Sequence, residues 1–453
     1  MWNKIRLSWP LAVICLCGAL VIAAANPAGA VPYSKKPIYD GFNLTTGGYP
    51  TFHFSNNGDI VYQTEVWSDT LGWVYSLHLY RQGDGSVTPI PSGTKLKFDL
   101  QINDNGQVVW LEESADFPHH TRIYIYKNGG TIPISSPDYR SGQPRLNNQG
   151  QVVYAASVYL DEESNDEEIF LYDGNAYGQL THQHLSNPRP VINNSGQLAW
   201  YSSNSSPVNV YFFNGSGIVP MVAVGDASKL QINDDGWVMW EISGVQDYTL
   251  YLYKGGDPAG NTIQLTSKIY YLSPDPQFGA SGQVVWIERD TDTGNKNLYQ
   301  YLSGITTPIS RADSTYHAFD VNRKGQIAFG KGYDIYLYSN NTATQISPSS
   351  THDFGGYLDP IINDNGQIVY FGGSFSQFDY TSHQDVYAYN RGTTKIDAYH
   401  TLGYDRNLQL INNGQIAWFE KLTGFSGQPN EMKIWLATPL STPNGALSLL
   451  LLN

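Results

Sequence analysis

Cysteine is nearly absent from this chain of 453 residues. The two cysteines, Cys15 and Cys17, lie close to the N-terminus in a segment that is expected to be removed. The remaining chain therefore has no thiol, which excludes disulfides, a cysteine-ligated zinc site and a cysteine nucleophile.

Basic residues are also scarce. The chain has 26 Lys and Arg against 40 Asp and Glu, a formal net charge of −14, and only 15% of its residues are charged. Nucleic acids and anionic membrane surfaces attract proteins of the opposite sign. Neither is therefore expected as a partner.

The longest apolar runs lie at the two ends of the sequence. Lys4 and Arg6 precede an apolar run and a small-residue site at Ala28–Ala30, the pattern of a signal peptide over residues 1–30. We therefore predict a secreted or periplasmic protein, with no membrane insertion after cleavage. The C-terminal tail, residues 439–453, ends in an apolar stretch too short to span a bilayer. It is either a packed terminal strand or the stub of an anchor or sorting tail.

Glycine and tyrosine are abundant, with 44 and 33 residues, which is typical of a chain rich in strands and turns. One motif recurs nine times, in most copies as an apolar residue, Asn-x-x-Gly and a strand that ends in an aromatic residue. The motif glycines are 40 to 48 residues apart, so the chain is a modular array. The copies are Phe54–Tyr62, Ile102–Trp110, Leu146–Tyr154, Ile192–Trp200, Ile232–Trp240, Phe278–Trp286, Val321–Phe329, Ile362–Tyr370 and Ile411–Trp418.

Each copy is predicted to be a β-hairpin. The Asn side chain can cap the backbone of the turn, and the glycine can take the left-handed conformation without a Cβ clash. The ninth copy is one residue shorter and fits a tighter turn at Asn413 and Gly414. The deletion therefore falls where the geometry of a hairpin permits it.

Further strands complete each repeat. After most motifs comes a strand with alternating large residues, such as Ile123–Tyr126, whose two faces both need cover. With a fourth strand, each repeat is an antiparallel meander of about 44 residues. This pattern predicts an all-β fold, a single β-propeller over residues 31–438 with nine, or alternatively eight, four-stranded blades. No fourth strand follows Met432–Trp435, so the N-terminal segment Lys36–Tyr39 is predicted to close the last blade.

The repeat resembles the blade consensus of TolB-type propellers and related bacterial extracellular repeat proteins. The resemblance lies in the motif itself, in Asp334–Tyr338, and in the endings Gln179–Thr181 and Gln345–Ser347. It covers essentially the whole chain after residue 30 and concerns the scaffold. Propellers that look like this serve in protein binding, in polysaccharide lyases and as gating domains of peptidases, and the scaffold does not choose among these functions.

The repeat also predicts which loops share a face. Loops from strand four to the next strand one, and from strand two to strand three, should emerge on one side, the loop face, and the Asn-x-x-Gly turns on the other, the turn face. Most histidines fall in loop-face segments. His182 and His184 lie on the same side of an extended segment, as a metal pair would, although a third ligand is not evident. Solvated loop histidines are the alternative.

A calcium site is the one cofactor site that the sequence indicates. Asp290, Asp292 and Asn295 place hard oxygen ligands close together, although the full EF-hand spacing is missing. An ordinary acidic turn is the alternative interpretation.

Aromatic residues fall into two groups. The motif tryptophans occupy equivalent positions in the repeat and are expected to pack inside the blades. Aromatic side chains of the loops can instead stack on sugar rings or on a partner protein. The residues predicted to bind, together with His182 and His184, are Trp67, Trp73, Tyr159, Tyr271, Arg140 and Arg189.

Catalytic signatures such as Gly-x-Ser-x-Gly, His-Glu-x-x-His, a phosphate loop or a dinucleotide fingerprint are absent from the sequence. The favoured hypothesis is a monomeric, secreted, non-enzymatic propeller that binds a protein or a polysaccharide through the loop face. The alternative is an extracellular polysaccharide lyase, or another carbohydrate-active enzyme, that uses His, Tyr and Arg of that face. Such an enzyme needs a base within about 3 Å of the proton that it removes.

Overall fold

The computed structural model describes most of the chain between residues 31 and 440. The described residues are 31–41, 52–113, 120–158, 166–182, 184–186, 188–202, 209–222, 226–243, 248–255, 261–269, 274–280, 282–289, 294–313, 318–332, 334–348, 358–375, 382–400, 407–422 and 431–440. The expected signal peptide and residues 441–453 of the expected tail lie outside them.

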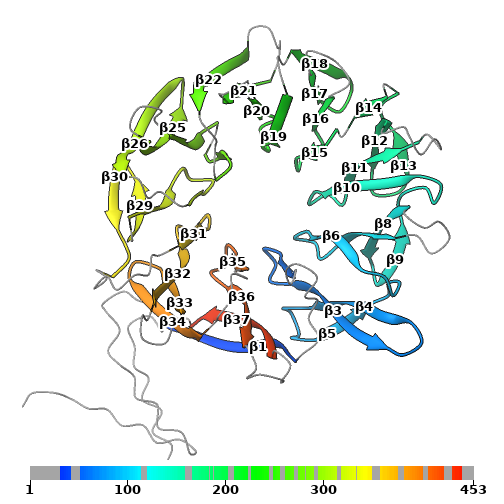
Figure 1. The fold of residues 1–453 in the computed structure, drawn as a ribbon, viewed down its shortest axis with the longest axis horizontal. Coiled ribbons are helices and arrows are strands. Elements are labelled where there is room, and N and C mark those ends of the chain that lie inside the picture. The colour runs from blue at the N-terminus through cyan, green and yellow to red at the C-terminus, as the bar shows by residue number, and fades with distance from the viewer. Residues whose placement is uncertain are drawn as a thin grey trace, which may run out of the picture.

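These residues form nine four-stranded antiparallel blades around a common axis (Figure 1), so the prediction of nine blades is confirmed. The first three blades contain β2 (Phe52–Phe54), β3 (Ile60–Ser68), β4 (Gly72–Tyr80) and β5 (Val87–Ile90); β6 (Lys97–Ile102), β7 (Val108–Glu113), β8 (Thr121–Lys127) and β9 (Gly130–Pro133); and β10 (Arg140–Leu146), β11 (Val152–Ser157), β12 (Asp166–Tyr172) and β13 (Tyr177–Gln179), where the short β14 (Leu185–Ser186) also pairs with β12.

The next three blades contain β15 (Val191–Ile192), β16 (Leu198–Ser202), β17 (Asn209–Phe213) and β18 (Ile218–Val222); β19 (Asp226–Ile232), β20 (Val238–Ser243), β21 (Tyr248–Tyr253) and β22 (Thr262–Ile269); and β23 (Gln277–Phe278), β24 (Val284–Arg289), β25 (Lys296–Leu302) and β26 (Ile305–Asp313).

The last three blades contain β27 (Phe319–Val321), β28 (Ile327–Lys331), β29 (Asp334–Ser339) and β30 (Thr342–Gln345); β31 (Leu358–Ile362), β32 (Ile368–Phe375), β33 (Ser382–Tyr389) and β34 (Thr393–His400); and β35 (Leu408–Leu410), β36 (Ile416–Leu422), β37 (Glu431–Pro439) and the N-terminal β1 (Tyr33–Gly41).

The ninth blade joins the two ends of the chain. β1 pairs antiparallel with β37, from Tyr33 opposite Pro439 to Gly41 opposite Met432, and the two strands run side by side in Figure 1. The N-terminal strand therefore closes the ring, as the sequence predicts. β37 ends at Pro439, one residue beyond the expected end of the propeller.

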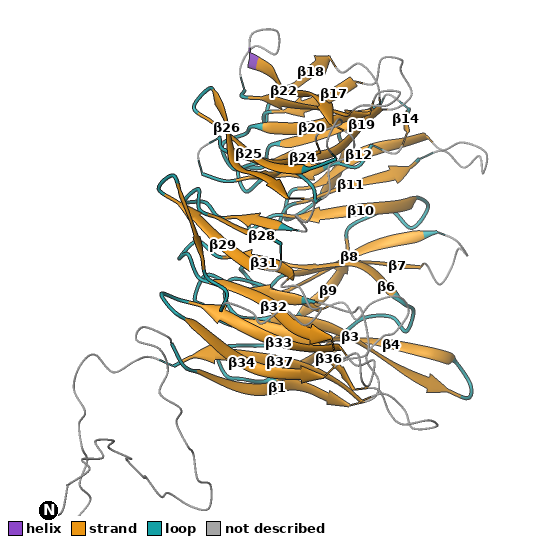
Figure 2. Ribbon diagram, turned by 60° about the vertical axis from the view of Figure 1, so that its left-hand side comes forward, coloured by secondary structure: helices purple, strands orange, loops and turns teal. Residues whose placement is uncertain are grey.

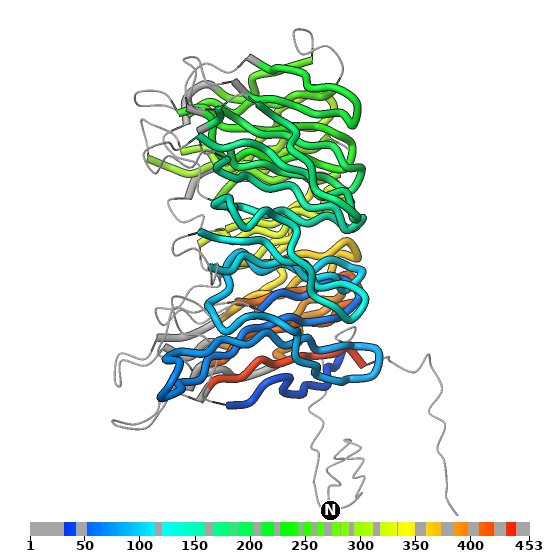
Figure 3. The backbone as a smooth tube through the Cα atoms, turned by 90° about the vertical axis from the view of Figure 1, so that its right-hand side faces the viewer, coloured from blue at the N-terminus to red at the C-terminus, as the bar shows by residue number. Residues whose placement is uncertain are grey.

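The motif turns have the predicted geometry. In the second blade, the Asn103 side chain accepts hydrogen bonds from the backbone N–H groups of Asn105 and Gln107 at 3.1 and 2.9 Å. Gly106 has a φ of 69°, and all nine motif glycines have positive φ. These turns align along one side of the ring in Figure 3.

Each blade carries one stacked aromatic pair in its middle. The aromatic residue that ends the motif lies opposite an aromatic residue of the third strand, with ring centroids 5.2–6.3 Å apart and planes within 11–20° of parallel. All five motif tryptophans are fully buried, so their predicted role in packing is confirmed. They are Trp110, Trp200, Trp240, Trp286 and Trp418.

The core lies between blades rather than within them. One cluster joins Val61 and Leu79 of the first blade to Val108 and Trp110 of the second. Another joins Phe52 of the first blade to blade-nine residues such as Phe419, so the ring is closed by packing as well as by strand pairing. No blade can bury both of its faces alone, which is why the array closes.

Candidate functional site

Among the described residues, the most exposed aromatic side chains lie at the end of the β3–β4 hairpin. Trp67 is directly opposite Trp73, with ring centroids 5.5 Å apart and planes at 76°, and the two side chains are 59% and 53% exposed. Val66 and Leu71 beside them are 50% and 69% exposed. Figure 2 shows this hairpin projecting at the lower right of the ring. A cluster of large exposed apolar side chains typically marks an interaction surface.

The sequence fixes the shape of this hairpin. β3 and β4 have nine residues each, and their pairing continues to Ser68 opposite Gly72. The Ser68 hydroxyl accepts a hydrogen bond from the Leu71 N–H at 3.4 Å, and Gly72 takes the left-handed conformation with a φ of 72°. Polar turn residues and a glycine therefore hold the two indoles in a defined arrangement.

The base of the hairpin is fixed to the second blade. The Tyr75 N–H donates to the Thr94 carbonyl at 2.9 Å, and the Lys97 ammonium donates to the Tyr75 carbonyl at 3.0 Å. Burial lowers the pKa of Lys97 to about 8, while Glu112, 3.7 Å away, acts in the opposite direction. These contacts therefore fix the base of the hairpin that carries the Trp67–Trp73 pair.

The two predicted loop histidines have separate partners. The Nδ1 atom of His182 lies 2.9 Å from the Gln179 amide nitrogen, and the Nδ1 atom of His184 lies 3.1 Å from a carboxylate oxygen of Asp166. The buried Glu168 accepts the His184 N–H at 2.8 Å. Within the described residues, no three His, Cys, Asp or Glu side chains are placed to share a metal ion.

The predicted arginines lie at the starts of two neighbouring blades. Arg140 begins β10, and Arg189 precedes β15, so both mark the loop-face ends of innermost strands, in blades three and four. His182 and His184 lie in the connection between these two blades. Both arginines are exposed. The fold therefore places His182, His184 and Arg189 in one connection, from blade three to blade four. Arg140 lies apart from them at the start of blade three, and Trp67 and Trp73 belong to blade one.

Several predicted residues lie outside the described part of the chain. They are Tyr159, Tyr271, Asp290 and Asp292. Asn295 is described, immediately before β25. The calcium site and the contribution of the two tyrosines remain predictions.

The turn face carries a feature that the sequence analysis did not anticipate. In most blades the N–H of the second turn residue donates to the Asn or Asp side chain at the same position in the next blade, at 2.8–3.3 Å. We call this row of links the turn belt. Its positions are Asn56, Asp104, Asn148, Asn194, Asp234, Ala280, Arg323, Asp364 and Asn412.

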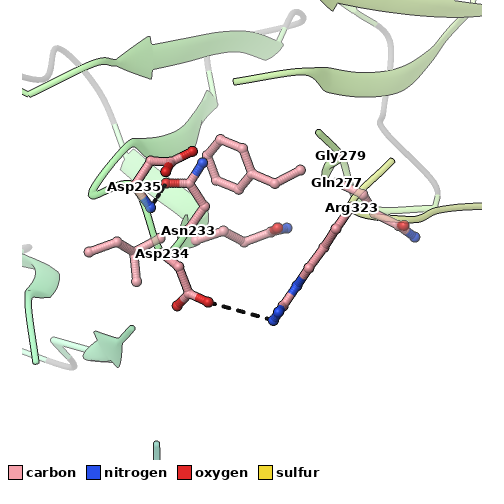
Figure 4. A pocket seen from close by; sticks show the side chains of 9 residues that line it. Asn233, Asp234, Asp235, Gln277, Gly279 and Arg323 are labelled. Atoms are coloured by element: carbon pink, nitrogen blue, oxygen red, sulfur yellow. Dashed lines mark hydrogen bonds and ion pairs between the residues drawn. The ribbon is translucent and has the colours of Figure 1, made fainter. Parts of the chain in front are cut away.

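The turn belt is interrupted at the sixth blade. Ala280 and Arg323 have no side-chain oxygen to offer, so the links into both positions are missing. Arg323 instead reaches across to Asp234, with 3.5 Å between its guanidinium and the carboxylate (Figure 4). A polar pocket of about 560 Å³ lies here, and Asp235 and Gln277 also line it; we call it the sixth-blade pocket. The signal in the sequence is the pair Gly279 and Ala280, where five of the other eight copies have Asn followed by Asn or Asp.

A second turn-face pocket, of about 950 Å³, lies between blades seven, eight and nine. Lys324 and Arg391 line it, together with amide side chains and Tyr389, and we call it the cationic pocket. No local motif marks it, because its residues come from turns of three different repeats.

Comparison with known proteins shows the class of fold. No family model and no curated protein matches the chain. Among solved structures, the eukaryotic initiation factor is similar at 11% identity and a TM-score of 0.55, over 83% of this chain and 94% of that chain. Dipeptidyl peptidase 4 of Porphyromonas gingivalis is similar at 14% identity and a TM-score of 0.51, over 85% of this chain and 66% of that chain. The protein is thus a β-propeller.

TolB from Acinetobacter baumannii is also among the matched structures, at 13% identity and a TM-score of 0.32, over 66% of this chain and 84% of that chain. The nine four-stranded blades bear out, at the level of the scaffold, the resemblance that the repeat predicts. The chain spans 60% of the acylaminoacyl peptidase of Pyrococcus horikoshii, another matched structure. In the described part of the chain, no helix has the length and hydropathy to cross a membrane.

Proposed function

We propose that this protein is a secreted or periplasmic binding protein that recognises a polysaccharide or a protein through its loop face, as a monomer. The observation that carries the proposal is the Trp67–Trp73 pair, which is half exposed on a hairpin whose base is hydrogen-bonded to neighbouring residues. Indole rings offer a large apolar area at a small cost in conformational entropy. They can cover a sugar ring or an apolar side chain of a partner.

The exposure of the two indoles has no structural explanation inside the blade. The five tryptophans that end a motif are fully buried, whereas Trp67 and Trp73 contact each other edge to face and leave their outer surfaces to solvent. Fixing these side chains in advance reduces the entropy that binding would cost. The arrangement therefore favours recognition.

The lyase hypothesis has weaker support. It requires His182 or His184 to act as a base, and both imidazoles are engaged, with Gln179 and Asp166 respectively. The peptidases among the similar structures share only the fold with this chain. Their activity is not carried over to this protein.

The test compares the chain from residue 31 with the variants Trp67→Ala, Trp73→Ala and the double variant. Binding is measured on an array of defined polysaccharides, with affinities from calorimetry. Loss of a central aromatic contact should weaken binding by at least about tenfold. Tyr177→Ala is the matched control, because Tyr177 is an exposed aromatic residue at the outer edge of blade three.

Two results would contradict the proposal. One is equal binding by the double variant and the unmodified chain. The other is release of unsaturated sugar ends from uronic-acid polymers, abolished by His182→Ala or His184→Ala, which would establish the lyase instead.

A further inference from the structure

Two cationic side chains that are adjacent in the motif turn of blade seven line different pockets. Arg323 lines the sixth-blade pocket and is paired with Asp234 at 3.5 Å (Figure 4). Lys324, the next residue, lines the cationic pocket with Arg391, which lies in the turn between β33 and β34. Two positions that adjoin in the sequence are thus in different electrostatic surroundings.

The cationic pocket contains no acidic side chain. Lys324 and Arg391 line it, and its other lining residues are uncharged, although the chain as a whole has a net charge of −14. Neither cation makes an ion pair or a side-chain hydrogen bond with the described residues. The nearby Asp364 does not line the pocket, and its carboxylate already accepts the Arg323 N–H and the Asn412 amide at 2.9 and 3.1 Å. Unpaired cations in such a hollow favour an anionic ligand.

The uncharged lining suits a ligand with hydroxyl groups. The Asn365 side-chain amide donates to the Asn412 carbonyl at 2.5 Å, and the Asn413 side-chain amide donates to the Gln415 side-chain oxygen at 2.8 Å. Each of the two amides keeps further hydrogen-bonding capacity. The Asn390 side chain and the Tyr389 hydroxyl have no partner among the described residues. Amides and a phenol that surround two cations can bind the hydroxyls that flank a carboxylate on a sugar ring.

Processing of the N-terminus would add a third positive charge. Val31 also lines the pocket, and its carbonyl accepts a hydrogen bond from the Thr394 hydroxyl at 3.2 Å. Cleavage after Ala30, which the sequence predicts, would leave the α-ammonium group on Val31. That group is largely protonated at neutral pH.

We infer that the cationic pocket is a second binding site, on the turn face, for an acidic oligosaccharide, whose carboxylate pairs with Lys324 and Arg391 while its hydroxyls bind the surrounding amides. The inference is independent of the loop-face proposal. The volume of about 950 Å³ falls in the range of small-molecule sites.

The experiment titrates a galacturonate trimer into the chain that begins at Val31, by calorimetry at low ionic strength. Binding should weaken as salt is added. Lys324→Gln and Arg391→Gln should each weaken it roughly threefold, and the double variant roughly tenfold. Arg323→Gln is the matched control and should leave the affinity unchanged. The variant with both Trp67→Ala and Trp73→Ala should also bind normally, which separates this site from the loop-face site.

Three results would overturn the inference: no binding of the trimer, equal binding of its neutral methyl ester, or an equal loss in Arg323→Gln. A glutamate trimer that binds as tightly as the sugar acid would overturn the assignment to a saccharide. N-terminal acetylation should weaken binding roughly twofold, and an unchanged affinity would remove Val31 from the site. Thermal melting of each variant confirms that it is folded.

Discussion

The β3–β4 hairpin contains two cross-strand aromatic pairs that differ in almost every respect. Tyr62 and His78 lie opposite each other inside the blade, with rings 5.2 Å apart and nearly parallel, and Tyr62 is 4% exposed. Five residues nearer to the turn on each strand, Trp67 and Trp73 meet at 76° and remain more than half exposed. The inner pair occupies a position that all nine blades share, whereas the outer pair belongs to the first blade.

The difference separates what the repeat requires from what individual copies add. The repeated apolar and aromatic positions of the strands are buried, because each blade must cover the face of its neighbour. Positions at which one copy departs from the others are where the Trp67–Trp73 hairpin and the sixth-blade pocket are found. Changes at repeated, buried positions should therefore affect stability most, and changes at exposed departing positions should mainly affect binding.

The largest effect is expected at a repeated, buried position. Trp240→Ala removes a fully buried indole that stacks on Tyr251 and packs against Val210 and Phe212 of the preceding blade. The free energy of unfolding should fall by about 3–5 kcal/mol. Denaturant unfolding followed by circular dichroism measures the change.

Trp240→Phe is the control for this prediction. The buried indole N–H of Trp240 has no acceptor among the described residues, so phenylalanine removes an unsatisfied donor along with some apolar area. Its cost should be clearly smaller than that of alanine. Equal losses for the two variants would show that packing at this position does not hold the blades together.

A half-buried position that departs from the repeat tests the comparison directly. Asp320 occupies the place of Gln101, Gln231, Gln277 and Gln409 in other blades, and its carboxylate accepts the Ile362 N–H at 2.8 Å. Burial raises the pKa of Asp320 to about 6, although backbone N–H groups act in the opposite direction. The folded state therefore binds this proton more tightly than the unfolded chain does.

The sign of the pH dependence follows from that shift. Below the ordinary value of 3.8 the group is protonated in both states and has no effect, and above about 6 the full cost of the buried charge is present. Asp320→Asn should raise the free energy of unfolding by about 1–3 kcal/mol above pH 6, and the gain should disappear as the pH falls towards 4. Denaturant melts across this range measure it, and Gln277→Glu should show the opposite trend. A gain that is independent of pH would contradict the argument.

Repair of the turn belt should have a smaller effect. Ala280→Asn supplies the missing side-chain oxygen beside the Asp234 N–H, as Asp104 does for Asn56 at 2.8 Å. One added hydrogen bond should raise the free energy of unfolding by about 0.5–1 kcal/mol. Thermal and denaturant melts provide the measurement. A loss of stability would show that the interruption at blade six is required by the local packing.

The smallest effect on stability is expected at the exposed pair. Trp73→Ala should change the free energy of unfolding by no more than about 0.5 kcal/mol, because more than half of its side chain is already in solvent. The same variant is expected to lose binding. A stability loss close to that of Trp240→Ala would mean that the hairpin is structural, and the distinction between repeated and departing positions would fail.

The sequence predicts the architecture in detail because the information is local and repeated. The nine positive-φ glycines, the burial of residues such as Trp110 and Trp418, and the pairing of the N-terminal strand with the last blade all follow from one motif and its neighbours. The exposure of Trp67 and Trp73 also follows, because both lie outside the repeating pattern.

The two turn-face pockets could not be predicted in the same way. Each is formed by turns of neighbouring blades, so its residues are distant in the sequence. Lys324 and Arg391 have no local signature, and their unpaired state depends on which side chains the fold places beside them. The departure at Gly279 and Ala280 was visible in the sequence, but only the turn belt shows what those residues fail to provide.

Because β1 pairs with β37, the ring closes only after the whole propeller has been synthesised. The strand that emerges first from the ribosome receives its partner only when the last blade has been made, so the ring cannot shut on a partial chain. A product truncated before Glu431 would lack β37, so β1 and β36 would each expose an unpaired edge. Unpaired sheet edges promote aggregation. In the intact protein these two edges are paired, so exposed sheet edges distinguish fragments from finished molecules.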